Sequence, residues 1–240
     1  MMNETKNYQM LSGSALKVIA MISMLIDHTA AFVLSRYQWA KTQFFVVGSH
    51  SLSIYRMMRI MGRIAFPIFC FLLVEGFMYT SNRKRYGINL LIFALISEVP
   101  WNLIHSRSFL YKGQNVFFTL FLGYIGLCII EKYKDSRKKQ LIGLLIGLLA
   151  AILLHADYGV SGYGFIIMLY ALKDSRIIRA IVGSCFLSNP YYAGIAFIPI
   201  ALYNGKRGFI KGKISKYAFY AFYPVHMLVL YVVRTVIITG

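Results

Sequence analysis

The residues from Ala15 to Leu34 read ALKVIAMISMLIDHTAAFVL, an almost unbroken apolar run. A helix of about 20 apolar residues is long enough to cross the hydrocarbon core of a bilayer. The run has no small-residue A-x-A cleavage site behind it, and it is too long for the core of a signal peptide. We therefore expect Ala15–Leu34 to be retained as a first membrane span.

The composition of the whole chain agrees with that expectation. Of its 240 residues, 58% are hydrophobic and only 14% are charged, whereas an ordinary soluble domain has about 25% charged residues. So much apolar surface cannot be hidden in one water-soluble core, and lipid must cover the rest. The composition predicts an all-α polytopic membrane protein.

Further apolar runs predict about nine transmembrane helices, several of them short. The predicted spans are Ala15–Leu34, Arg59–Tyr79, Gly87–Ile104, Val116–Ile130, Leu141–Leu154, Gly159–Leu172, Ile177–Phe186, Gly194–Tyr203 and Ala218–Ile238. The stretch Ile177–Tyr203 allows two interpretations: two short helices, or one re-entrant hairpin broken at Ser188-Asn189-Pro190. In the fifth span, Gly143 and Gly147 form a GxxxG motif, which indicates close helix packing inside the protein rather than a dimer face.

The distribution of charge predicts the orientation. The chain has 26 Lys and Arg against 8 Asp and Glu, a net charge of +18. Most of the basic residues fall in alternate connecting segments, as the positive-inside bias requires if the N-terminus is cytoplasmic and the C-terminus lies outside. Because these residues lie between apolar runs, they indicate anionic lipid headgroups as partners rather than nucleic acid.

Polar side chains inside the spans mark a candidate functional site, since each ionisable group there costs about 2.5–3.5 kcal/mol. The predicted topology places one set in the outer half and a basic set near the inner surface, below His226. The outer set is Asp27, His28, Arg59, Arg63, Glu98, Asn115, His155 and Asp157, and the inner set includes Lys17 and Lys216. For the carboxylates two interpretations remain open: a reaction site, or buried pairs that only hold helices together.

Helical geometry relates three residues of the first span. Lys17 and His28 are eleven residues apart, about three turns and about 16 Å, so they share one helix face. Asp27 is rotated by about 100° from His28, and we do not expect it to bond the same imidazole. The three cysteines have no metal-ligand spacing, and we expect no metal site.

These residues lie in segments that together resemble the TraX family, whose namesake acetylates the N-terminus of F-pilin. The segments, in chain order, are Leu16–His28, Arg59–Phe77, Leu91–Trp101, Gln114–Thr119, Ala156–Gly164 and Lys216–Leu228. The first span also has a pattern of one basic residue, ten further residues and then His. This pattern is similar to the first helix of the wider transmembrane acyltransferase superfamily. That superfamily usually has Arg where this chain has Lys17, which keeps the charge but lacks the bidentate fork.

The resemblance implies one transmembrane acyltransferase-like domain over residues 1–240, in the cytoplasmic (cell) membrane, with acetyl-CoA as acyl donor. His28 would be the general base or a transient acyl carrier, and Asp27 would assist it. The residues implied to bind substrate are Glu98, Arg63, Asn115 and Asp157; those implied to bind the donor are Lys17, Arg59, Lys216, Tyr223 and His226. The acceptor would be an amine, or a hydroxyl, on a peptide, a sugar or a small molecule at the outer face.

Two other function classes remain open on the sequence. A proton-coupled transporter or flippase would also bury charges, but it predicts internal repeats, and the sequence has no convincing one. A noncatalytic assembly factor for surface structures leaves the Asp27-His28 pair without a role. We therefore expect an enzyme, and the sequence does not give its oligomeric state.

Overall fold

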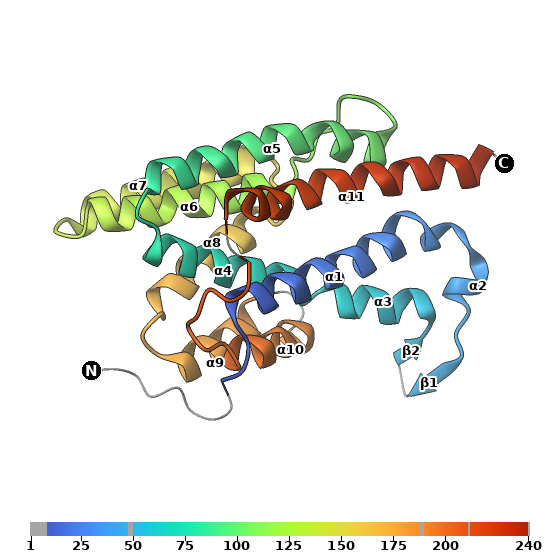
Figure 1. The fold of residues 1–240 in the computed structure, drawn as a ribbon, viewed down its shortest axis with the longest axis horizontal. Coiled ribbons are helices and arrows are strands. Elements are labelled where there is room, and N and C mark those ends of the chain that lie inside the picture. Colours follow the sequence, from blue (N-terminus) through green and yellow to red (C-terminus); the bar gives the residue numbers. More distant parts are fainter. Residues whose placement is uncertain (1–8, 48–49, 188–189, 211, 240) are drawn as a thin grey trace. The chain divides into compact units, whose positions relative to one another are not determined.

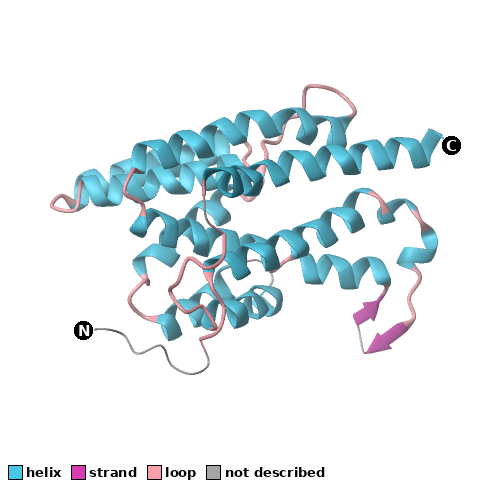
Figure 2. Ribbon diagram, viewed as in Figure 1, coloured by secondary structure: helices cyan, strands magenta, loops and turns pink. Residues whose placement is uncertain are grey.

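The computed structural model describes residues 9–47, 50–187, 190–210 and 212–239, and that part of the chain is mostly helical (Figure 1). Its helices are α1 (Gly13–Phe32), the 3-10 helix η1 (Leu34–Arg36), α2 (Gln38–Lys41), α3 (Ile54–Gly62), α4 (Ala65–Tyr79), α5 (Arg83–Ser106), α6 (Val116–Lys132), α7 (Arg137–Leu153), α8 (Gly159–Ala171), α9 (Arg176–Phe186), α10 (Pro190–Ala201) and α11 (Lys213–Thr239). The strands β1 (Phe45–Val47) and β2 (His50–Leu52) form one small hairpin (Figure 2).

The predicted all-α class is confirmed, and a helix overlaps each of the nine predicted spans. Within the described residues, four helical segments are long and apolar enough to cross a membrane: Gly13–Arg36, Ile54–Tyr79, Arg83–Ser106 and Ile214–Ile237. Helices α6 to α10 have at most 17 residues each. The number of crossings and the orientation of the termini stay predictions.

Two boundaries differ from the predicted spans. The second span is divided at Arg63 and Ile64, where α3 ends and α4 has not begun. The stretch Ile177–Tyr203 forms two short helices, α9 and α10, while Ser188 and Asn189 of the predicted break lie outside the described residues. At 1.5 Å per residue each of these helices is about 16–18 Å long, shorter than a bilayer core of about 30 Å.

The chain divides into two compact units, each described here by itself. The terminal unit comprises residues 1–69 and 191–240, and the central unit comprises residues 70–190. In the terminal unit, α1 packs on α3 and on α11. The connection from α1 to α3 contains η1, α2 and the β-hairpin, in which Phe45 pairs with Leu52 and Val47 with His50. This connection lies between the first two predicted spans, for which the sequence predicted no regular element.

In the central unit, α6 packs on α5, α7 and α8. The GxxxG glycines bring these helices together, because a Cβ on Gly143 would meet Ile129 of α6 and one on Gly147 would meet the Tyr163 ring of α8. The prediction that this motif serves packing inside the protein is confirmed.

Candidate functional site

His28 lies near the end of α1 and forms a hydrogen bond with a second histidine from α11. His28 Nδ1 is 2.7 Å from His226 Nε2. The two ring planes differ by 6° with centroids 5.0 Å apart, so the rings lie side by side in nearly one plane, where an in-plane nitrogen lone pair can accept a hydrogen bond. The rings of Phe32 and Tyr223, with centroids 5.6 and 6.2 Å away, also flank His28.

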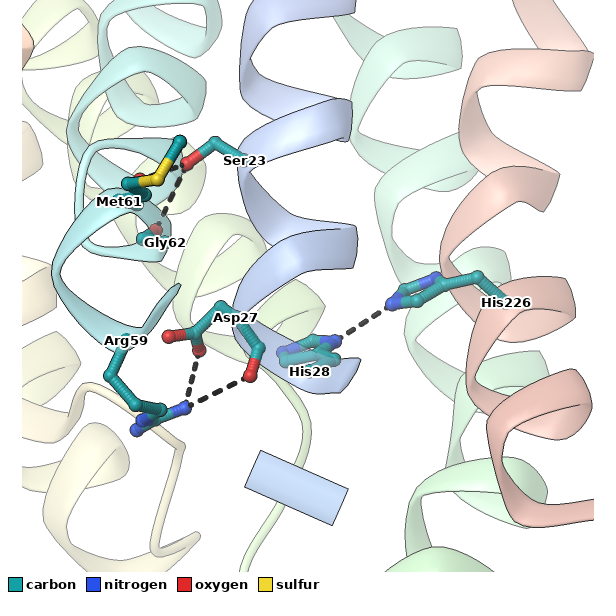
Figure 3. Close-up of polar contacts among 7 residues, drawn as sticks. All are labelled: Ser23, Asp27, His28, Arg59, Met61, Gly62 and His226. Atoms are coloured by element: carbon teal, nitrogen blue, oxygen red, sulfur yellow. Dashed lines mark hydrogen bonds and ion pairs between the residues drawn. The ribbon is translucent and has the colours of Figure 1, made fainter. Parts of the chain in front are cut away.

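The carboxylate of Asp27 points away from His28, toward α3 (Figure 3). Its Oδ2 accepts a hydrogen bond from Arg59 at 2.6 Å, and these two side chains form an ion pair. This direction agrees with the rotation of about 100° between neighbouring helical residues. Asp27 thus fixes α1 to α3, and Arg59, expected near the acyl donor, is engaged in this pair.

Two small residues allow α3 to approach α1 closely at this level. Ser23 donates from its hydroxyl to the carbonyl of Met61 at 2.7 Å and to that of Gly62 at 3.2 Å. A Cβ on Gly62 would overlap the side chain of Asp27. Any larger residue at position 62 would therefore push on the Asp27–Arg59 pair.

At the other end of α1, cationic side chains gather around Lys17. Arg207 and Lys216 are close enough to repel the Lys17 ammonium electrostatically, and that ammonium lies 5.6 Å from the centroid of the Phe219 ring. Within the described ranges, the ion pairs involve none of these three cations. A cluster of like charges without acidic partners is suited to an anion such as a phosphate.

The loop before α11 brings Arg207 to this cluster by binding the start of α1. Gly13 N–H donates to the carbonyl of Lys206 at 2.8 Å, and Ser14 N–H donates to that of Arg207 at 2.9 Å. The loop needs glycine at position 208, because its φ is +91° and a Cβ there would collide with Ser12. Since two of the first N–H groups of α1 are occupied, the side-chain cations, and not the helix end, would hold an anion.

Helices α1 and α11 repeat the same order of residues. Lys17 precedes His28 by eleven residues, and Lys216 precedes His226 by ten, distances of about 16 and 15 Å along the helices. Because lysine meets lysine and histidine meets histidine, the two helices run in the same direction. If both cross the membrane, the chain must cross it an odd number of times.

The remaining predicted residues differ in position and burial. Arg63 and Tyr223 belong to the terminal unit; Arg63 is exposed after the end of α3, although it still acts electrostatically on Asp27. Tyr223 is buried beside both histidine rings. Glu98, Asn115 and Asp157 belong to the central unit.

Asn115 is used for structure in the central unit. It is fully buried and caps α6 by accepting from the N–H of Phe117 at 3.0 Å. Its amide nitrogen donates to the carbonyl of Ala94 at 2.8 Å and to the carboxylate of Glu98. Both N–H donors of this amide are therefore engaged within the protein, and substrate binding by Asn115 stays a prediction.

Asp157 is exposed in the turn between α7 and α8. That turn lies beside the chain before α6, where Gln114 N–H donates to the carbonyl of His155 at 3.0 Å. In the described part of the chain, no group of three or more histidine, cysteine or carboxylate side chains is placed to hold a metal ion.

Several residues of the terminal unit that surround the candidate site were not predicted from the sequence. Arg207 completes the cation cluster, and Phe32 packs on His28. Phe222 supplies a carbonyl 2.8 Å from His226 Nδ1. This last contact follows from helical spacing, because a side chain can reach the carbonyl four residues before it.

Comparison with known families decides where this chain belongs. The family model described as TraX protein matches residues 12–234. The chain belongs to the TraX family. Because the described part of the chain has four helical segments long and apolar enough to cross a bilayer, this TraX-family chain is a membrane protein.

A curated relative agrees with the TraX assignment. It is named "Probable fimbrial assembly protein FimC, serogroup H1", from Dichelobacter nodosus. The two sequences are 32% identical over 250 residues, which cover 91% of this chain and 94% of the relative. No solved structure matches the chain.

Proposed function

We propose that this TraX-family protein is a membrane-bound acetyltransferase. It moves an acetyl group from cytoplasmic acetyl-CoA to an amine at the outer side of the cytoplasmic membrane. The amine is carried by a pilin-like polypeptide, an amino sugar or a small molecule, and a hydroxyl is the alternative acceptor. Family membership and the printed name of the relative favour a polypeptide that is assembled into a surface fibre.

The observation that carries this proposal is the matched order of cations and histidines on α1 and α11. Lys17, Arg207 and Lys216 form a cluster at one end, suited to the phosphates of acetyl-CoA. The pair of His28 and His226 lies about three helical turns away along α1. A donor held by its phosphates at the cations can extend its thioester along these helices toward His28.

The chemistry required of His28 is proton transfer. The acceptor nitrogen forms a bond to the acetyl carbon, the carbon–sulfur bond breaks, and the proton leaving the nitrogen passes through His28 to the thiolate sulfur. Imidazole is suited to this exchange because it titrates near neutral pH. In the alternative course, His28 first takes the acetyl group on its own nitrogen and then transfers it to the acceptor.

Charge supports the direction of transfer. The cation cluster lies at the N-terminal ends of α1 and α11, and the positive-inside bias assigns such residues to the cytoplasm, where acetyl-CoA is present. The C-terminus and His28 then lie toward the outer side. Nine crossings satisfy the odd number that parallel α1 and α11 require.

The test is acetyl-CoA binding and thiol release by the purified protein in detergent, beside His28→Ala. We expect the unaltered protein to release free thiol when an acceptor amine is supplied, with a pilin-derived peptide and an amino sugar compared as acceptors. His28→Ala should still bind acetyl-CoA but release no thiol. If neither protein binds acetyl-CoA, the acetyltransferase proposal is wrong.

The name of the relative favours one second candidate, a noncatalytic assembly factor. Such a protein would support fibre formation in cells without any acetyl transfer. Cells that carry His28→Ala in place of the unaltered protein distinguish the two. Normal fibres on those cells, with no acetyl group lost from the subunits, would favour the assembly role.

A further inference from the structure

We infer that His226 is a positioning residue that fixes the tautomer of His28, so that Nε2 of His28 is the atom that accepts the proton. The inference rests on the proposed function only for its kinetic consequence. The tautomer itself follows from two hydrogen bonds and can be measured without any reaction.

The argument begins at the carbonyl of Phe222, which can only accept a hydrogen bond. His226 Nδ1 is 2.8 Å from this oxygen, so Nδ1 must carry a proton; otherwise two lone pairs would face each other. His226 is 5% exposed, and burial favours the neutral imidazole, which has one N–H. Nε2 of His226 is therefore an acceptor.

The second hydrogen bond transmits this choice to His28. Nδ1 of His28 lies 2.7 Å from the acceptor Nε2 of His226, so it must donate. Neutral His28 then has its proton on Nδ1 and its lone pair on Nε2. The nearly coplanar rings allow the donated hydrogen to lie along the lone pair of His226 (Figure 3).

Orientation by a hydrogen-bonding partner is a general requirement for a histidine base, since the other tautomer has no lone pair where the proton arrives. The partner of His28 is the neutral imidazole of His226 and not a carboxylate. The carboxylate of Asp27, the residue before His28, is paired with Arg59 instead. When Nε2 of His28 takes the acceptor proton, the hydrogen bond from Nδ1 to His226 strengthens and stabilises the imidazolium. The proton then leaves from Nε2 to the thiolate, and His226 ends unchanged.

Three variants separate these effects. His226→Gln retains a side-chain oxygen that can accept from Nδ1, whereas His226→Leu has no acceptor. Phe32→Leu is the matched control, because it removes the ring on His28 from α1 without touching this hydrogen bond. Each variant is made in the full chain.

The structural test is nitrogen NMR of the histidine-labelled protein in bilayers, with the His28 signals assigned by their loss in His28→Gln. We expect the Nδ1–H tautomer of His28 in the unaltered protein, in His226→Gln and in Phe32→Leu. His226→Leu should show a mixture or the Nε2–H tautomer. If His28 has the same tautomer in His226→Leu as in the unaltered protein, the inference is overturned.

The kinetic test uses thiol release from acetyl-CoA. His226→Leu should lower kcat by about 10²-fold, the lower end of what a positioned general base contributes, with KM for acetyl-CoA unchanged. His226→Gln should recover most of that loss. Loss of acetyl transfer by His226→Gln equal to that by His226→Leu would also overturn the inference. Absence of acetyl transfer in every protein, with the expected tautomers present, would instead contradict the proposed function alone.

Discussion

The two units of the chain use polar side chains in opposite ways. In the terminal unit, His28 and His226 meet through ring nitrogens that can exchange protons, and the cations around Lys17 have no acidic partners in the described residues. In the central unit, Glu98 and Asn115 satisfy each other and the neighbouring backbone. Polar residues on apolar helices therefore form the proposed reaction site in the terminal unit and a structural link in the central unit.

This difference shows that a polar side chain inside an apolar helix is only a candidate for chemistry. Its partners decide the outcome. An amide with both N–H groups engaged has no further N–H to donate, whereas an imidazole has two ring nitrogens that can exchange a proton. Arg59 in the terminal unit is likewise directed by its partner, since its Nη1 donates to Asp27.

The largest expected effect tests whether the two units differ in their role, by removing one polar group from each. His28→Gln should lower the rate of acetyl transfer by about 10²–10⁴-fold, as expected for loss of a general base. Glu98→Gln should lower it by less than about tenfold, because its oxygen can still accept from Asn115. Thiol release in detergent measures both. Equal losses would show that the central unit also contributes to the reaction.

The next largest effect is expected on stability. Asn115→Leu removes the cap of α6 and the side-chain amide that donates to Ala94 and Glu98, which should cost about 2–4 kcal/mol of unfolding free energy. The buried thiol of Cys70 reports unfolding through a thiol-reactive dye in a background that carries both Cys128→Ser and Cys185→Ser. Acetyl transfer per folded molecule should be preserved. A stable Asn115→Leu protein without activity would place Asn115 in the reaction instead.

One glycine substitution in each unit tests the same difference, with smaller expected effects. Gly147→Ala should cost about 1–3 kcal/mol of stability through overlap with Tyr163, with activity retained by the folded fraction. Gly62→Ala should instead reduce acetyl transfer more than stability, because it displaces Asp27 at the turn of α1 that carries His28. Thermal unfolding and thiol release, measured on the same preparations, separate the effect on stability from the effect on acetyl transfer. The reverse pattern would argue against a positional role for α3.

The smallest effect is expected at the cation cluster. Lys17→Gln should raise KM for acetyl-CoA by about tenfold, comparable to one hydrogen bond to a charged group, and the effect should shrink as salt is added. Lys17→Arg should keep most of the affinity. Lys84→Gln, an exposed cation on α5 of the central unit, is the control. An equal rise in KM for Lys84→Gln would mean that total charge, and not this cluster, attracts the donor.

The local features of this protein could be predicted from its sequence. The apolar runs identified a helix for every predicted span, and the spacing of Lys17, Asp27 and His28 gave their directions on α1. The β-hairpin was missed because its strands have only three residues each, too few for an alternating pattern to be recognised. The break before α4 was missed because an apolar run resumes directly after Arg63.

Pairing between distant segments required the tertiary structure. His28 and His226 are 198 residues apart, and the sequence marked each of them as unusual without relating them. Arg207 was one cation among many in a basic loop until that loop was seen to bind the start of α1. Hydropathy and helical period depend on near neighbours along the chain, so the sequence alone determined the membrane class and the faces of each helix. Which buried groups satisfy one another depends on how helices pack, and only the tertiary structure decided that His28 has a histidine as its partner and Glu98 an asparagine.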